Sequence, residues 1–271
     1  MSADPKIVLC IKWGTKYAAD YVNRLYGMVS RNLSPPFRFI CFTDDPTGIR
    51  SEVEIYPLPE LGCEPPAKGP GAWRKTGLWG HTLFNLTGVA LFLDLDVVIT
   101  RPIDELFTYG SQDDVILARN WIRPLERLGQ SSVFRYPIGK HGYMLDSFRR
   151  DPLGTQAKYS YEQRYVTNGI QGGVKFFPSQ WIVHFRLNCL GPWFVRYLRR
   201  ATVPEATKIV MFAGGPRPGD ALLGRWTSKD PILSRAEHLW RLFNGNRRES
   251  FGRHLKHYLK PVPWVAEYWR E

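Results

Sequence analysis

Leu91-Phe92-Leu93-Asp94-Leu95-Asp96-Val97-Val98-Ile99 is the stretch on which the prediction of the fold depends. Apart from two aspartates it is apolar and rich in β-branched residues, which is typical of a buried parallel strand. Because side chains alternate across a strand, we expect Asp94 and Asp96 to point the same way. Burying ionised carboxylates costs several kcal/mol unless they are paired or bound to metal. The stretch therefore predicts a cation or hydrogen-bond donors at the end of a strand.

Two interpretations of this aspartate pair remain open. It suits a hard divalent ion, Mg2+ or Mn2+, that also contacts phosphate oxygens. It also suits a hydrogen-bonded strand end at the surface, or carboxylates that cap neighbouring helices. The apolar residues on both sides favour the ion, since they leave little room for solvent.

The residues before the aspartate pair alternate between strand and helix patterns. A strand over 6–12, a helix starting near residue 18 and a strand over 37–43 make a βαβ unit, and a further helix is expected over 73–86. No repeat or break in composition marks a domain boundary. The pattern predicts an α/β domain, and later strands are expected over 52–56, 113–118, 132–136, 174–178, 181–185 and 208–212.

Composition limits the class of protein. The 271 residues are 44% hydrophobic, enough for a core, and the four cysteines show no Cys-x-x-Cys spacing, which favours reduced thiols and the cytoplasm. We find no basic-then-apolar leader and no apolar run near 18 residues, so neither export nor a membrane span is expected. The net charge of +12 favours an anionic partner: nucleic acid, a phosphorylated ligand or an anionic bilayer.

Two further segments suggest contact with an anion. Arg74 and Lys75 lie in the first turn of the helix expected over 73–86, where the helix dipole disfavours cations, so a bound anion would explain them. The glycine-rich turn 213–219 contains Arg217 and could offer backbone N–H groups and one charge to a phosphate. Solvated charge and ordinary loop chemistry are the alternative readings.

Four segments in order along the chain resemble nucleotide-sugar-dependent glycosyltransferases of the GT-A fold. The closest resemblance is to glycosyltransferase family 8, which contains glycogenin and bacterial lipopolysaccharide galactosyltransferases, and it covers about residues 6–220. The Asp94-Leu95-Asp96 segment with its Arg-Pro-x-x-Glu-Leu-Phe continuation is the most specific match. The four segments are Lys75–Trp79, Val89–Phe107, Glu162-Gln163 and Val210–Pro218.

The resemblance implies a single Rossmann-like GT-A domain with a mostly parallel sheet over 1–224, followed by a basic, aromatic-rich helical extension over 225–271. It implies a retaining, metal-assisted transfer of sugar from a UDP-linked nucleotide-sugar donor to a hydroxyl of a glycan or glycolipid acceptor. Asp94 and Asp96 would hold Mn2+ or Mg2+, and Gln163 and Glu162 would be catalytic. Donor-binding positions would be Lys75, Arg74, Asp94, Gly214 and Arg217.

The chain departs from the family at the third metal ligand. Where the family has a histidine this chain has Met211, and a thioether is a poor ligand for Mg2+ or Mn2+. Several substitutes remain open: more water on the ion, Asp220 or His184 as ligand, or weak metal affinity. A non-catalytic protein that binds sugar nucleotides or glycans on the same fold is therefore the alternative function.

The last residues alternate basic and aromatic side chains. Phe251, Leu255, Tyr258 and Leu259 would form one stripe of a helix, which predicts peripheral contact with anionic lipid on the cytoplasmic, inner face of the membrane. Packing of the stripe on the remainder of the protein is the alternative. A nucleic-acid partner is not expected, because the chain has no nucleic-acid-binding motif. The basic residues of this region include Arg235, Arg241, Arg247, Arg248, Arg253, Lys256 and Lys260.

Overall fold

The computed structural model describes residues 5–67, 69–123, 125–244 and 249–271, and the chain divides into two compact units. Unit 1 consists of the chain up to Leu95 together with Pro102–Ser179, and unit 2 consists of Asp96–Arg101 and Gln180–Glu271. The boundary that the sequence predicts at 224/225 lies inside unit 2. There Val262, beyond that boundary, donates its backbone N–H to Ala221 O, before it, at 3.1 Å.

Unit 1 is built on a seven-stranded sheet with the order β3-β2-β1-β4-β7-β6-β8. Strand β7 runs antiparallel to β4 and β6, and every other neighbouring pair is parallel. The expected mostly parallel sheet is thus confirmed. The strands are β1 (Lys6–Lys12), β2 (Phe37–Thr43), β3 (Glu54–Tyr56), β4 (Val89–Leu93), β6 (Ile116–Arg119), β7 (Gly129–Pro137) and β8 (Lys175–Phe176).

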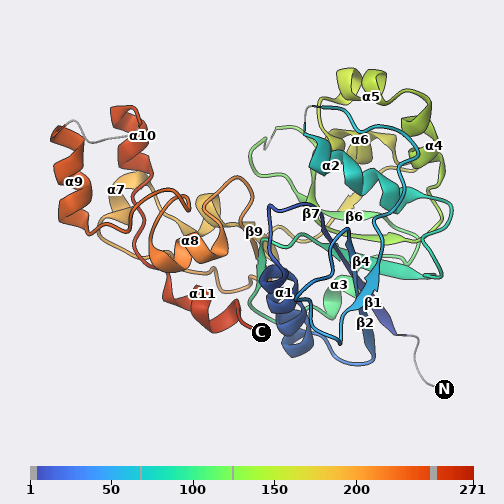
Figure 1. Ribbon diagram of the computed structural model, residues 1–271, viewed down its shortest axis with the longest axis horizontal. Helices are drawn as coiled ribbons and strands as arrows, with labels where there is room; N and C mark the ends of the chain where they lie inside the picture. The colour runs from blue at the N-terminus through green and yellow to red at the C-terminus, as the bar shows by residue number, and fades with distance from the viewer. Residues whose placement is uncertain (1–4, 68, 124, 245–248) are drawn as a thin grey trace. The chain divides into compact units, whose positions relative to one another are not determined.

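Helices pack on both faces of this sheet (Figure 1). Helix α1 (Ala19–Asn32) buries Val22, Leu25 and Met28, and its Tyr26 meets Phe39 of β2 edge to face. A larger core fills the other face, where Trp73 stacks on Phe148 with ring centroids 5.3 Å apart. The remaining helices of unit 1 are α2 (Pro70–Arg74), the 3-10 helix η1 (Lys75–Trp79), α3 (Glu105–Thr108), α4 (Tyr143–Arg150), α5 (Pro152–Tyr159) and α6 (Glu162–Gly169).

The prediction of a helix over 73–86 is wrong beyond Trp79, where the helical conformation ends. The chain forms α2 and then η1, and it leaves the helical conformation at Gly80, whose backbone is extended. Leu83 and Leu86 then pair across a tight turn in which Phe84 has a positive φ of 52°. Leu83 and Leu86 are buried while Phe84 is exposed, so the apolar spacing that suggested a helix comes from a turn that buries its two flanking leucines.

The single strand expected over 91–99 is also wrong. Strand β4 ends at Leu93, and β5 (Val97–Ile99) belongs to a different sheet in unit 2. Asp94 therefore lies near the end of the first segment of unit 1, and Asp96 is the first residue of the first segment of unit 2. Since the two aspartates do not share a strand, alternation along a strand does not fix their directions.

Unit 2 contains a three-stranded sheet with the order β5-β10-β9 and a set of short helices. Helix α10 packs on α7 and α9, and α11 packs on α8. Within the described residues no helix has the length and apolar character needed to cross a bilayer. The elements are β9 (Ile182–His184), the π-helix η2 (Phe185–Cys189), α7 (Trp193–Arg196), β10 (Ile209–Met211), α8 (Pro218–Leu223), α9 (Arg235–Phe243), α10 (Phe251–Lys256) and α11 (Pro263–Tyr268).

Candidate active site

A lysine and an aspartate meet at the end of β4 in unit 1. Lys75 begins η1, and its Nζ lies 2.7 Å from Asp94 Oδ1 and 2.9 Å from Asp94 Oδ2. The same ammonium donates to the backbone carbonyl of Ser131 on β7 at 2.9 Å and lies over the ring of Phe92. Both charged side chains are largely shielded, with exposed fractions of 14% for Lys75 and 26% for Asp94. The predicted donor-binding pair Lys75 and Asp94 is therefore in direct contact.

A buried carboxyl group extends this cluster. Glu162, the first residue of α6, is only 1% exposed and accepts a hydrogen bond from Ser131 Oγ at 2.6 Å. Burial raises the pKa of Glu162 to about 7, while Lys75 and the Ser131 hydrogen bond pull it down. Its other oxygen, Oε1, is buried and has no hydrogen-bond partner among the described residues. An orphaned buried oxygen is costly, so this atom is suited to a ligand hydroxyl.

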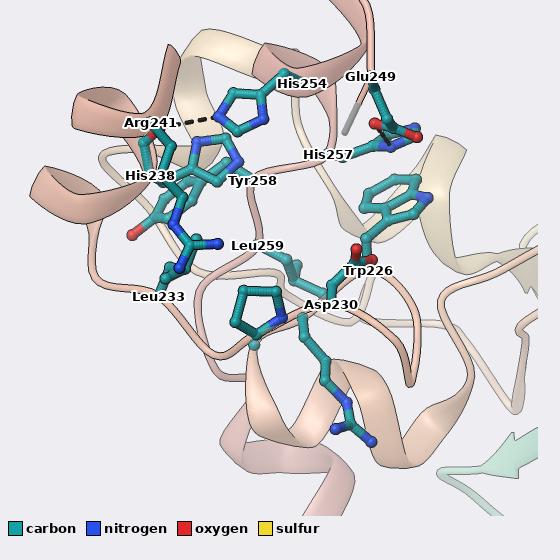
Figure 2. A pocket seen from close by; sticks show the side chains of 13 residues that line it. Trp226, Asp230, Leu233, His238, Arg241, Glu249, His254, His257, Tyr258 and Leu259 are labelled. Carbon is teal, nitrogen blue, oxygen red and sulfur yellow. Dashed lines mark hydrogen bonds and ion pairs between the residues drawn. The ribbon is translucent and has the colours of Figure 1, made fainter. Parts of the chain in front are cut away.

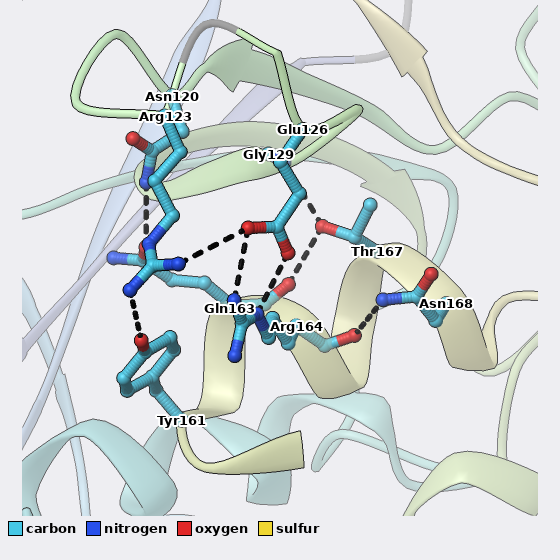
Figure 3. Close-up of polar contacts among 9 residues, drawn as sticks. All are labelled: Asn120, Arg123, Glu126, Gly129, Tyr161, Gln163, Arg164, Thr167 and Asn168. Atoms are coloured by element: carbon cyan, nitrogen blue, oxygen red, sulfur yellow. Dashed lines mark hydrogen bonds and ion pairs between the residues drawn. The ribbon is translucent and has the colours of Figure 1, made fainter.

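The amide of Gln163 is held by two other amides, of which Figure 3 shows Asn120. Asn120 Nδ2 donates to Gln163 Oε1 at 3.2 Å, and Gln163 Nε2 donates to Gln130 Oε1. Gln130 and Asn120 are both buried, so the chain of three amides fixes which way the Gln163 carbonyl points. Glu162 and Gln163 thus stand side by side at the start of α6 with separate partners.

Ion pairs tie the loop after Asn120 to helix α6 (Figure 3). Arg164 makes a two-pronged bond with Glu126, with Nε–Oε1 and Nη2–Oε2 distances of 2.7 and 2.9 Å. Arg123 Nη2 donates to the hydroxyl of Tyr161 at 3.0 Å. Paired donors and acceptors of this kind fix orientation as well as distance. These contacts fix the loop, which connects Asn120 to Gln130, against the start of α6.

Arg74 lies apart from the Lys75–Asp94 contact. Its guanidinium is 5.0 Å from the ring centroid of Trp13, in the loop after β1. Its Nε is buried without a hydrogen-bond partner among the described residues. The structure thus brings together Lys75, Asp94, Glu162 and the neighbour Gln163, and it places Arg74 against an aromatic ring.

The remaining predicted site residues belong to unit 2. The backbone carbonyl of Asp96 accepts from Phe212 N at 3.1 Å, just after β10, in which Met211 is buried. Gly214 has a φ of 76°, in the left-handed region that favours glycine. Arg217 follows and directly precedes α8.

The two suggested substitutes for the family's histidine both have partners within unit 2. His184 Nε2 lies 3.1 Å from Ala213 O, and His184 Nδ1 accepts from Arg186 N at 3.2 Å. Burial, with the nearby Arg186 charge, lowers the pKa of His184 to about 4, so the ring is neutral at pH 7. Asp220 binds Arg225 Nε at 2.8 Å. Over the part of the chain that the structure describes, no group of three or more His, Cys, Asp or Glu side chains is placed to hold a metal.

Sequence reasoning missed Asn120, Gln130 and Ser131. The last two lie in β7, which is buried along its whole length. Polar residues at the start of an otherwise apolar buried strand need partners, and Gly129-Gln130-Ser131-Ser132 carried that signal. Asn120 had no comparable signal, because its role depends on a loop that closes through an Asn120 N to Leu128 O bond at 2.9 Å.

Comparison with known proteins finds likeness in solved structures. No protein-family model matches the chain, and no curated protein sequence matches it. The galactosyltransferase LgtC, in complex with donor and acceptor sugar analogues, has a TM-score of 0.54 at 13% identity over 96% of this chain and 99% of its own. The glycosyltransferase GlyE of Streptococcus pneumoniae TIGR4 has a TM-score of 0.56 at 10% identity over 98% of this chain.

A further match is the bifunctional glycosyltransferase WbbM in its apo form, with a TM-score of 0.55 at 11% identity over 80% of this chain. This chain spans 47% of the WbbM chain and 65% of the GlyE chain. At such low identity the likeness establishes the fold, and it confirms the GT-A-like fold that the sequence predicted. The chain therefore has the α/β fold of these glycosyltransferases.

Proposed function

We propose that this protein is a glycosyltransferase that moves a sugar from a nucleotide-sugar donor to a hydroxyl of a glycan or lipid-linked acceptor. The observation that carries the proposal is the polar cluster of Lys75, Asp94, Ser131 and Glu162, with Gln163 beside it, in a unit whose fold is that of glycosyltransferases. The likeness to LgtC, whose structure contains donor and acceptor sugar analogues, supports this choice of substrate class.

Lys75 is proposed to neutralise the leaving group. When the bond from the anomeric carbon to the donor phosphate breaks, negative charge grows on the diphosphate, and a fixed ammonium stabilises it. Asp94 holds the ammonium in place at 2.7 Å. The acceptor oxygen bonds to the anomeric carbon, and its proton passes to the departing phosphate oxygen.

Gln163 and Glu162 are proposed to contact the sugar. An amide oxygen is a weak nucleophile, so front-face attack by the acceptor hydroxyl with retention of configuration is the favoured course, and Gln163 supports the ring. Glu162 Oε1, buried and without a hydrogen-bond partner among the described residues, would bind a sugar hydroxyl.

A divalent ion is also part of the proposal. Carboxylates are suitable ligands for Mg2+ or Mn2+, and Mg2+ is commonly held by one or two carboxylates plus substrate phosphates and water. Asp94 and Asp96 would hold the ion, which when bound would add positive charge at the diphosphate. Because the described residues offer no third ligand of the usual kinds, metal binding should require the donor.

Release of UDP tests this function. The protein is incubated with UDP-glucose, UDP-galactose or UDP-N-acetylglucosamine, with and without Mn2+, and both UDP release and thermal stabilisation are measured. Lys75→Met should weaken donor binding by about 1.5–3 kcal/mol, the range for a hydrogen bond to a charged group. Lys175→Met is the matched control, since Lys175 also pairs with an aspartate, Asp114, at 2.7 Å, but on the exposed surface.

The other variants separate binding from chemistry. Gln163→Ala should preserve UDP binding and lower kcat, and Asp96→Asn should leave the fold intact and abolish Mn2+-dependent transfer. Stabilisation by UDP-sugars without any UDP release would instead favour the second candidate, a non-catalytic protein that binds sugar nucleotides. Equal loss of UDP binding in the Lys75 and Gln163 variants would contradict the separate roles.

Peripheral contact with an anionic membrane is the proposed location, through a surface that shares only Phe251 with the stripe expected from sequence. Helix α10 ends at Lys256, and Tyr258 is buried and stacks on Tyr197 with centroids 4.3 Å apart, so Tyr258 and Leu259 belong to the core of unit 2. Large exposed apolar side chains instead lie on or just after α7, α9 and α10, elements that pack together. They are Trp193 at 40%, Phe194 at 57%, Leu198 at 69%, Trp240 at 58%, Phe243 at 77% and Phe251 at 48%.

Charge supports the same surface. Residues 180–271 contain 16 Lys and Arg against 7 Asp and Glu, and each basic residue near an anionic surface contributes about 1 kcal/mol. Arg247 and Arg248, part of the predicted basic set, lie outside the described residues. Sedimentation with phosphatidylserine vesicles should show binding that high salt weakens and that Trp240→Ser with Phe243→Ser reduces. Unchanged binding by this double variant would rule out the surface.

A further inference from the structure

Unit 2 contains a pocket that the proposed transferase chemistry does not use (Figure 2). The open space between its walls, mouth included, is about 570 Å3. Three of the six histidines of the chain contribute to its wall. The residues that line it are Gly224, Arg225, Trp226, Asp230, Pro231, Leu233, His238, Arg241, Glu249, His254, His257, Tyr258 and Leu259.

Four charged or titratable side chains of this wall, Arg225, Asp230, Glu249 and His257, have partners. Arg225 pairs with Asp220 at 2.8 Å, and His257 Nδ1 lies 2.6 Å from Glu249 Oε2. Asp230 Oδ2 accepts from Thr227 N and Oγ1 at 2.9 and 2.7 Å. Arg241 and Asp230 add one charge of each sign to the same wall, so the wall offers little excess attraction for a strongly charged ligand.

Aromatic and apolar groups form the rest of the wall. The rings of His238 and His254 stack with centroids 3.9 Å apart, and Trp226 stacks on His257 at 4.3 Å. Burial, and then the neighbouring His254, lowers the pKa of His238 to about 4, so this ring is neutral at pH 7. Leu233, Pro231 and Leu259 add aliphatic surface.

These two kinds of surface suit a ligand that has apolar C–H faces and many hydroxyls. A carboxylate retains acceptor sites after one bond, and a guanidinium has five donors, so paired Asp, Glu and Arg side chains still bind hydroxyl groups. A phosphate would meet the carboxylates of Asp230 and Glu249 in the same wall. A purely apolar ligand would displace water from these polar groups without replacing the lost hydrogen bonds.

We propose that this pocket binds one neutral sugar residue of a glycan, at a site separate from the donor cluster. Every lining residue belongs to unit 2, whereas Lys75, Asp94, Glu162 and Gln163 belong to unit 1. The inference goes beyond the proposed transfer reaction, since a protein that binds glycans without turnover would use the pocket in the same way.

Ligand-observed NMR tests the pocket on the full chain. Saturation transfer is measured to methyl glucoside, methyl galactoside and N-acetylglucosamine, with uridine and glucose 1-phosphate as comparison ligands. Leu233→Trp, which fills the pocket, should lower affinity for the bound sugar at least about tenfold. Ile232→Trp is the matched control, because Ile232 is the preceding residue, is 56% exposed and does not line the pocket; it should keep the affinity of the parent.

The measurement of sugar binding does not depend on whether the protein transfers sugar. Binding that survives Lys75→Met and is lost in Leu233→Trp supports the proposal whether or not UDP is released. No sugar binding, equal loss in the two tryptophan variants, or preference for uridine or glucose 1-phosphate over the neutral sugars would overturn it. Circular dichroism of both tryptophan variants confirms that they are folded.

Discussion

At the scale of single residues, Glu162 has the clearest consequence for stability. Its carboxyl has a pKa of about 7 in the folded protein, against an ordinary value of 4.5, because burial disfavours the charged form. A raised folded-state pKa gives stability that is fully present below pH 4.5 and is lost as the pH rises through 7. By linkage the loss amounts to about 3 kcal/mol.

We therefore predict that Glu162→Gln removes this pH dependence. Urea unfolding of the parent protein, followed at several pH values from 4.5 to 8, should show unit 1 weakening as the pH rises, and the variant should not show that component. Comparing slopes with pH avoids any constant difference between Glu and Gln. An identical slope in the two proteins would mean that the carboxyl titrates normally.

At the scale of elements, the start of α9 offers a sharp test. Ser234 and Glu237 form a capping box, in which Ser234 N donates to Glu237 Oε2 at 2.8 Å and Glu237 N donates to Ser234 Oγ at 3.3 Å. Loss of such a cap costs about 1 kcal/mol. Ser234→Ala should lower the midpoint of unit 2 unfolding accordingly.

Ser250→Ala is the matched control for this cap. Ser250 precedes α10 in the same N-cap position, but its side chain makes no capping hydrogen bond. The change at Ser250 should stay within about 0.5 kcal/mol. If both variants lose the same stability, serine at these positions acts through backbone propensity and not through the capping box.

The elements also show what sequence patterns resolve and what they do not. Periodicity located β1, α1 and β2 closely, because each pattern is long and bounded by loop residues. It failed over 73–86, where a turn with two buried leucines follows a short helix, and over 91–99, where the chain changes sheet. In both places apolar residues follow one another in runs that resemble a helix or a strand. Local patterns record burial, and they do not record which sheet a strand joins.

The candidate site was predicted in part for a similar reason. Asp94 and Lys75 were named from residue patterns as well as from a resemblance, and Glu162 and Gln163 from the resemblance alone. The structure places Lys75, Asp94 and Glu162 in one cluster. Ser131 was missed because its link between Lys75 and Glu162 depends on β7 lying beside β4. No spacing in the sequence predicts that antiparallel pairing.

At the scale of the whole molecule, the two units should respond to pH in opposite directions. In unit 2, burial lowers the pKa of both His184 and His238 to about 4 from an ordinary 6.5. A depressed folded-state pKa gives stability that is present above pH 6.5 and is lost as the pH falls towards 4, by about 3 kcal/mol for each ring. In unit 1 Glu162 acts in the reverse sense, and its large shift opposes the smaller one of His141, whose pKa burial also lowers.

We predict that hydrogen exchange separates the two units. Between pH 7.5 and 5, and after correction for intrinsic rates, amides of α9 in unit 2 should lose protection while amides of α6 in unit 1 keep or gain it. His238→Gln should reduce the acid sensitivity of α9. Parallel loss of protection in both units would show that they unfold as one cooperative body.

The discontinuity of unit 2 has a consequence for how the chain is synthesised. Strand β5 contributes the edge of the unit 2 sheet, where Ile99 pairs with Ile209 and Val97 with Met211. During synthesis β5 therefore emerges from the ribosome long before its partner strand β10 is made. The segments on either side of β5 belong to unit 1. Nascent chains must keep Val97-Val98-Ile99 from aggregating during that interval, and a fragment cut to begin at Gln180 would leave β10 with an unpaired edge.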